Sequence, residues 1–285
     1  MIVNMPNKEG VTLATEGKYC AENIKVVPTF EMSEGNTLNE FLKGTKTEIT
    51  AEDLAGITTI RDYAFYYDPI TSIELPETIA EIGSNAFSNS SNLKRIDYNG
   101  DLTSWCNIKM SGHSSAPTFN SADLYIKGAL LEDLITPENI TTINKYAFLG
   151  CQSIRTVLIS DNVTNFGSGV FQSCNNLVSA VIGNGVTSLT EVFRGCTNLA
   201  KVTLGEGITT ITWHCFSSCT NLMEVICLAE TPPYINNTVF TNVPENCIFK
   251  VKSASVEAYK SETNWSVRAD YIIALTPEEE ALYGG

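Results

Sequence analysis

Cysteine and histidine are the residues of this chain whose chemistry draws attention first. Nine cysteines and two histidines occur in 285 residues. His214 and Cys215 are adjacent and Cys219 follows, a spacing that superficially resembles part of a zinc site. A high, odd number of cysteines in a small secreted domain would instead suggest a disulfide framework. Which chemistry applies depends on where the fold places the thiols.

Most of these cysteines recur at regular intervals along the sequence, which would distribute their thiols along the fold and not gather them at one point. Four of them come three residues after a recurrent phenylalanine: Cys151, Cys174, Cys196 and Cys219. Equivalent positions of stacked repeats lie about 5 Å apart along one axis, whereas a metal needs ligands around a single centre. We therefore predict a core ladder of small thiols, with no metal and no cofactor. Cys215 fills a slot that other repeats give to alanine or valine. Disulfides between rungs stay open, because the distance permits them.

No arrangement typical of an enzyme is recognisable in the sequence. It contains no Ser-His-Asp or Cys-His spacing, no GxxxxGK[ST] and no GxGxxG motif. Acids recur at one turn position of the repeat, which is more typical of a solvated edge than of an acid–base pair: Glu77, Glu138, Asp161 and Glu206. We predict a protein that is not an enzyme. A hydrolase using Glu or Asp in an irregular segment, residues 99–137, remains a third hypothesis.

Charge and hydropathy exclude several kinds of partner. Lys and Arg number 18 against 32 Asp and Glu, a net charge of −14, which disfavours nucleic acid and anionic membranes because both need clustered basic residues. Hydrophobic residues make up 43% of the chain, so disorder throughout is excluded. No apolar run is long enough for a membrane-spanning helix. The first ten residues lack the basic and apolar regions of a signal peptide.

A repeat of about 23 residues organises the middle of the chain. It is marked by Phe65, Phe87, Phe148, Phe171, Phe193, Phe216 and Phe240. After each bend, a leucine or isoleucine opens a period-2 alternation typical of a short strand, and turn residues then lead to a second short apolar stretch. Such a unit cannot bury its apolar side alone, so we predict that the copies stack into a solenoid with parallel strands.

Residues 70–93 carry the repeat pattern most fully, at Ile70, Ile73, Leu75, Pro76, Ile79, Ile82, Gly83, Ala86, Phe87, Ser90 and Leu93. The pattern resembles the leucine-rich repeat of the BspA type, over about residues 54–245. The resemblance implies a right-handed solenoid of short parallel strands that works on a bacterial surface or outside the cell. Its partner would be a protein or glycan on a cell surface.

The two ends of the chain depart from the repeat. Residues 1–40 resemble a small β-module of tail-associated proteins from phages and prophages of gut bacteria, with an N-terminal cap or linker as the alternative. The solenoid is expected over 41–245, with an inserted loop around 110–120 in its irregular segment. Residues 246–275 resemble the family's C-terminal α/β cap, and the acidic tail 276–285 is expected to be frayed.

The expected binding surface is the outward face of the strands. Its candidate residues are Arg95, Asp97, Thr156, Leu158, Ser179, Val181, Lys201, Thr203, Glu224 and Ile226. Leu158 and Val181 are apolar neighbours, with Ile226 two repeats further on, and an exposed apolar strip is typical of a contact site. The structural alternative is that neighbouring elements cover the strip or that single apolar residues are exposed without a role.

These observations favour a non-enzymatic recognition or adhesion protein. The N-terminal resemblance favours a phage or prophage tail component, which contacts a host surface or neighbouring virion proteins and needs no signal peptide because lysis releases it. The alternative is a secreted or cell-surface adhesin of the BspA type. We expect no nucleic acid and no membrane insertion, and the oligomeric state is left open.

Overall fold

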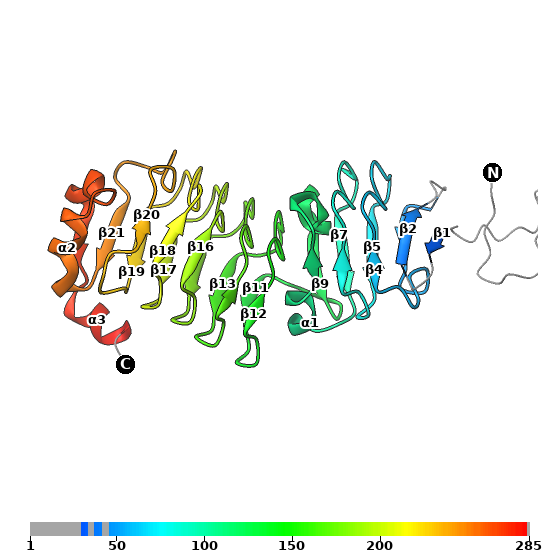
Figure 1. The fold of residues 1–285 in the computed structure, drawn as a ribbon, viewed down its shortest axis with the longest axis horizontal. Helices are drawn as coiled ribbons and strands as arrows, with labels where there is room; N and C mark the ends of the chain where they lie inside the picture. The colour runs from blue at the N-terminus through cyan, green and yellow to red at the C-terminus, as the bar shows by residue number, and fades with distance from the viewer. Residues whose placement is uncertain (1–29, 34–36, 42–45, 284–285) are drawn as a thin grey trace, which may run out of the picture.

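The computed structural model describes residues 30–33, 37–41 and 46–283. It is an elongated stack of short strands, with two helices at its C-terminal end and a short one near the middle (Figure 1). The predicted module of residues 1–40 lies outside the described residues, except for two antiparallel strands, β1 (Phe30–Ser33) and β2 (Thr37–Phe41). In the described part of the chain, no helix is long and apolar enough to cross a membrane.

Each repeat contributes one strand to each of two rows. In the N-terminal half, the first row is β3 (Glu48–Ile49), β5 (Ser72–Leu75), β7 (Arg95–Tyr98) and β9 (Asp123–Ile126), which β10 (Ala129–Leu130) closes as an antiparallel edge. The second row is β4 (Thr59–Ile60), β6 (Glu81–Ile82) and β8 (Lys109–Met110), paired with β2. All strands within a row that come from successive repeats are parallel, as predicted.

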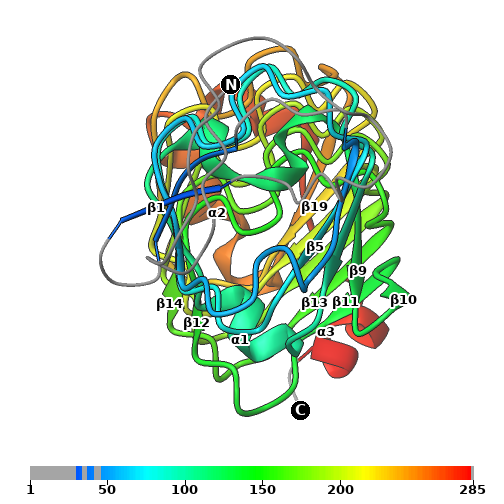
Figure 2. The same ribbon diagram turned by 90° about the vertical axis from the view of Figure 1, so that its right-hand side faces the viewer.

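The C-terminal half repeats this arrangement with new sheets. Its first row, called here the main sheet, is β11 (Asp133–Ile135), β13 (Thr156–Ile159), β15 (Ser179–Ile182), β17 (Lys201–Leu204), β19 (Glu224–Cys227), β21 (Ile248–Val251) and β22 (Ile272–Ala274). The second row pairs β12 (Thr142–Ile143) with β14 (Asn165–Phe166), and β16 (Ser188–Thr190) with β18 (Thr210–Thr212) and β20 (Tyr234–Ile235). Viewed along the stack, the two rows face each other across the interior (Figure 2). The predicted solenoid is confirmed.

The interior is built from residues that occupy the same position in successive repeats. Ring centroids of Phe148 and Phe171 lie 5.6 Å apart, and those of Phe171 and Phe193 lie 5.9 Å apart, with nearly parallel planes. The register Val157↔Ala180↔Val202 places like positions of adjacent strands side by side. Alternate residues of each strand therefore enter one continuous core, which offsets the entropy of ordering many short segments.

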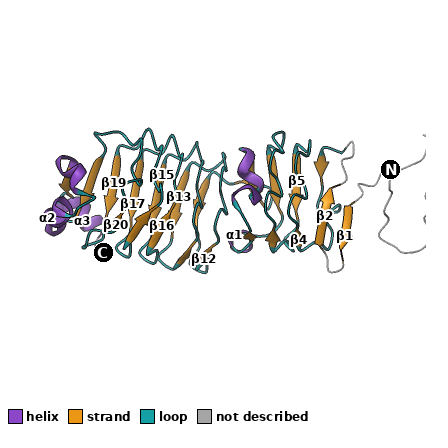
Figure 3. Cartoon of the chain, turned by 45° about the horizontal axis from the view of Figure 1, so that its top comes forward, coloured by secondary structure: helices purple, strands orange, loops and turns teal. Residues whose placement is uncertain are grey.

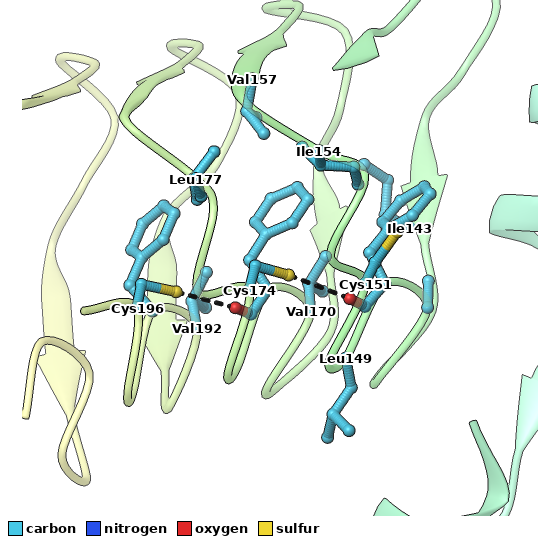
Figure 4. Close-up of a cluster of buried hydrophobic side chains, with 14 of the residues drawn as sticks. Ile143, Leu149, Cys151, Ile154, Val157, Val170, Cys174, Leu177, Val192 and Cys196 are labelled. Atoms are coloured by element: carbon cyan, nitrogen blue, oxygen red, sulfur yellow. Dashed lines mark hydrogen bonds between the residues drawn. The ribbon is translucent and has the colours of Figure 1, made fainter. Parts of the chain in front are cut away.

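The predicted cysteine ladder is present, and its thiols make hydrogen bonds between repeats (Figure 4). Cys174 Sγ donates to the carbonyl of Phe148 at 3.1 Å, and Cys196 Sγ donates to that of Phe171 at 2.9 Å. The Ser90 hydroxyl makes the same bond to Phe65, which explains why serine and cysteine share this position. The eight cysteines in the described part of the chain are buried free thiols. Burial raises their pKa, to about 12 for Cys215.

The irregular segment differs from the expected inserted loop. Helix α1 (Leu102–Cys106), two 3-10 turns (His113–Ser115 and Pro117–Asn120) and strands β8 and β9 make it a complete turn of the stack. Trp105 is buried and donates its indole N–H to the carbonyl of Ala147 at 2.9 Å, and Thr118 donates to that of Leu149 at 2.7 Å. These contacts reach into the following repeat, and residues 115–118 are buried where an exposed loop was expected.

The hydrolase hypothesis places its carboxylates in this irregular segment. That hypothesis requires a concave pocket in residues 99–137 that contains a carboxylate with a raised pKa. Asp101 instead caps helix α1, and hydrogen bonds from the Ser104 backbone and hydroxyl lower its pKa.

The C-terminal end is covered by helices and a final strand (Figure 3). A 3-10 turn (Ser253–Ser255), α2 (Val256–Ser261) and a second 3-10 segment (Ser266–Tyr271) lead into β22. Trp265 is buried between Phe240, Phe249 and Tyr259, with ring centroids 5.1–5.9 Å away. The expected fraying of the tail is wrong for residues 277–283, which form helix α3 (Pro277–Tyr283).

The thiol ladder generates a stability prediction. Replacing Cys196 with serine retains a donor to the Phe171 carbonyl, so we expect an unfolding free energy within about 1 kcal/mol of wild type. Replacing it with valine removes the donor and forces an extra methyl into a closed bend, with an expected loss of about 1–3 kcal/mol. Urea denaturation followed by circular dichroism measures both. Equal losses for the two variants would mean that the Sγ–carbonyl contact contributes nothing.

Candidate recognition surface

The outward face of the main sheet carries two parallel rows of side chains. The row near the start of each strand is polar over β11 to β19: Asp133, Thr156, Ser179, Lys201 and Glu224. The row two residues further on begins with apolar residues, Ile135, Leu158 and Val181, which we call the apolar row. They are 60%, 44% and 39% exposed. The register places them on adjacent strands, about 5 Å apart.

The same row is buried at its C-terminal end, contrary to the sequence-based expectation. Thr203 is only 3% exposed and Ile226 is completely buried, although both were predicted to face solvent. Ile226 forms a small cluster with Leu228 and Leu275, against which Tyr283 of helix α3 packs. The acidic tail therefore covers the strand face where it was expected to extend freely into solvent.

A chain of ion pairs connects helix α3 to the sheet. Glu224 accepts from Lys201 Nζ at 2.6 Å and from Lys250 Nζ at 3.0 Å, and Lys250 also contacts Glu279 of α3 at 2.5 Å. Partial burial raises the pKa of Glu224, but the hydrogen bonds from the two lysines outweigh it and lower that pKa overall. Lys201 and Glu224 thus take part in attaching the tail.

Two of the predicted contact residues lie on a different sheet. Arg95 and Asp97 belong to β7 in the N-terminal half, where they form a bidentate pair with distances of 2.6 and 2.8 Å. The guanidinium carbon of Arg95 also lies 3.8 Å above the ring centre of Tyr125 on β9. The irregular segment therefore separates Arg95 and Asp97 from the apolar row. Thr156 and Ser179, in contrast, lie on the main sheet next to the apolar row.

Ile135 is a member of the apolar row that sequence reasoning missed. It lies at the end of the irregular segment, where the phenylalanine period is interrupted, so no strand was predicted there. Its spacing of one repeat before Leu158 is the signal that could have identified it. The register Ile135↔Leu158 confirms that the two positions are equivalent.

The zinc-like spacing does not gather ligands in the structure. Cys215 lies buried beside Phe216, and Cys219 donates to the Phe193 carbonyl at 3.1 Å. The backbone N–H of His214 donates to Thr238 at 3.2 Å. Within the described ranges, no group of three His, Cys, Asp or Glu residues is arranged to hold a metal ion.

Comparison with known proteins identifies the repeat. The family model of the BspA type leucine-rich repeat region matches residues 45–120 and 121–246, with six copies. A search of curated proteins finds no significant match.

Several solved structures are similar to the chain. A leucine-rich repeat protein of T. pallidum is 22% identical, over 79% of this chain and 92% of that one, with a TM-score of 0.42. The pneumococcal vaccine antigen PcpA is 14% identical, over 85% and 79%, with a TM-score of 0.42. A leucine-rich cell surface protein of Faecalibacterium prausnitzii is 16% identical, over 95% and 98%, with a TM-score of 0.31.

The ion pairs around Lys250 predict that the tail detaches in acid. Glu224 and Glu279 have lowered pKa values, so their stabilising contribution is present above the ordinary value of 4.5 and is lost as the pH falls through the depressed values. We expect wild type near pH 3, and Lys250→Met at pH 7, to expose Ile226 and to bind more of the dye ANS. Lys260→Met on α2 is the control. Unchanged ANS fluorescence with Lys250→Met would show that apolar contacts alone hold α3.

Proposed function

Because the chain belongs to the BspA-type leucine-rich repeat family, we propose that it is a non-enzymatic recognition or adhesion protein. Such repeats act as scaffolds for protein interaction. The observation that carries the proposal is the apolar row on the main sheet. Ile135, Leu158 and Val181 stay exposed, whereas the C-terminal part of the same face is covered by the chain's own helix.

The chemistry around the apolar row favours a protein partner. The row spans about 10 Å across three strands, and the hydroxyls of Thr156 and Ser179 flank it on the same sheet. An apolar centre with a polar rim is the usual composition of a protein contact. A glycan on a cell surface is the other partner class, and hydroxyl-rich flanks would serve its recognition too.

Two settings would display such a surface, and the family favours the first. Repeats of the BspA type are typically found in bacterial cell-surface proteins, which supports an adhesin. The resemblance of residues 1–40 to a phage or prophage tail module supports a virion component that contacts a host surface. In both settings the solenoid presents the main sheet to a partner outside the cell.

The apolar row predicts how binding responds to charge. We expect the double variant Leu158→Asp and Val181→Asp to lose at least about tenfold in affinity for a partner found on protein or glycan arrays, because carboxylates cannot be desolvated against apolar atoms. Its melting temperature should remain close to that of wild type, since both side chains are exposed. Val178→Asp is the matched control, an exposed valine just before strand β15.

The control variants separate binding from folding. Ile226→Asp should lower the melting temperature by several degrees, because Ile226 is buried beneath the tail. If Leu158→Asp with Val181→Asp destabilises the protein as strongly, the apolar row serves the core. If affinity is unchanged, the partner binds another face.

The gene and its neighbours discriminate the two settings. For a surface adhesin we expect a signal peptide or a cell-wall anchor in the full reading frame. For a virion component we expect tail, baseplate and lysis genes beside it. Sequencing the locus provides the measurement, and a tail cluster without an export signal would contradict the adhesin.

A further inference from the structure

Three tyrosines form an exposed aromatic surface at a bend near the N-terminal end of the stack. Tyr63 and Tyr67 are 53% and 59% exposed, and Tyr66 lies between them. The ring of Tyr66 makes edge-to-face contacts with both, at centroid distances of 5.4 Å to Tyr63 and 4.5 Å to Tyr67. We call these three residues the tyrosine bend. The edge-to-face contacts hold the three rings in place, and the sides of the rings that make no such contact are exposed to solvent.

The backbone of the tyrosine bend is unfavourable for tyrosine. Tyr63 and Tyr67 have φ values of 62° and 55°, in the left-handed region where a bulky side chain is an outlier. Equivalent positions two residues after the phenylalanine are left-handed throughout the described repeats, where they hold Asn89, Gly150, Ser173, Gly195, Ser218 and Asn242. The fold thus needs only a small residue or asparagine here. Tyr67 adds strain and little burial, which points to a use outside folding.

An open hollow with polar walls lies on the residues that lead into the tyrosine bend. Its volume is about 530 Å³, and it is bounded by β4, β6 and the residue that follows β8. Its charged walls are Arg61, Asp62 and Glu81, and Thr59 and Ser111 contribute hydroxyls. Asp62 directly precedes Tyr63, and its Oδ1 accepts the backbone N–H of Ser84 at 2.6 Å, which orients the carboxylate. The volume lies within the range that small ligands occupy.

We propose that the tyrosine bend and this hollow bind a neutral glycan. Tyrosine rings can stack on the C–H faces of pyranose rings, while a guanidinium and carboxylates make charge-assisted hydrogen bonds to hydroxyl groups. Two carboxylates against one guanidinium in the walls, on a chain of net charge −14, disfavour sialylated or sulfated sugars. Mostly polar walls suit a sugar better than the apolar anchor of a protein. This site is separate from the main sheet, so it does not rest on the proposed function.

A printed array of neutral and sialylated oligosaccharides tests the proposal with the full chain. We expect wild type to retain neutral oligosaccharides, and Tyr63→Asn with Tyr67→Asn to reduce that signal at least about tenfold through loss of two stacking rings. These substitutions copy Asn85 and Asn89, which hold the same left-handed positions one repeat later. The melting temperature should therefore not fall.

Matched variants make each outcome decisive. Trp213→Asn alters another exposed aromatic residue with positive φ, far along the stack, and should leave the signal unchanged. Glu81→Gln leaves the bend intact and should weaken retention about fivefold through one lost charge-assisted bond. The apolar-row variant with Leu158→Asp and Val181→Asp should bind the glycan normally, which separates this site from the main sheet.

The proposal is overturned by any of four results. These are no retention of neutral oligosaccharides, preference for sialylated ones, equal retention by the tyrosine variant, or a clear drop in its melting temperature.

Discussion

Each repeat of this protein can satisfy the backbone of its bend only through its neighbours. The N–H of Phe148 donates to the carbonyl of Val170 in the next repeat, and that of Phe171 donates to Val192. In the other direction, the Cys174 thiol donates to the Phe148 carbonyl. Stacking buries these groups, and each one would cost about 1–3 kcal/mol if the neighbouring repeat did not supply its partner. Stability is therefore a sum along one axis, and it requires covered ends.

This constraint divides every repeat into positions that the fold controls and positions that it leaves free. The phenylalanine, its preceding small residue and the ladder position meet a neighbour directly, so they accept few residue types. Ser90 and Cys174 can occupy the same repeat position because each donates to the carbonyl of the phenylalanine one repeat earlier in the stack, Phe65 for Ser90 and Phe148 for Cys174. Outward strand positions and exposed bend positions face solvent, so the fold accepts many residue types there and the needs of a binding partner can decide which residue is present. Leu158 and Tyr67 stand at such free positions, which is why they carry information about function.

The same division explains how far sequence reasoning could go. The period of the phenylalanines was sufficient for the solenoid, the parallel strands and the cysteine ladder, because all three follow from local repetition. The burial of Ile226 was not predictable in this way, since it depends on Leu275 and on Tyr283 of helix α3, which lie about 50 residues later in the chain. The inserted-loop interpretation failed for a similar reason. Trp105 and Thr118 find their partners 42 and 31 residues later, outside any repeating pattern.

Part of the chain's negative charge comes from acids at the repeat turn, and these acids have a structural role. Asp161 accepts the backbone N–H and the side-chain amide of Asn184 in the next repeat, and Asn184 in turn accepts the N–H of Glu206. Acids of this turn edge thus link successive repeats while keeping negative charge along one side of the stack. A partner approaching that edge would meet repeated carboxylates. The apolar row and the tyrosine bend consist of exposed side chains without charge, so they offer neutral or apolar contacts that the acidic turn edge does not offer.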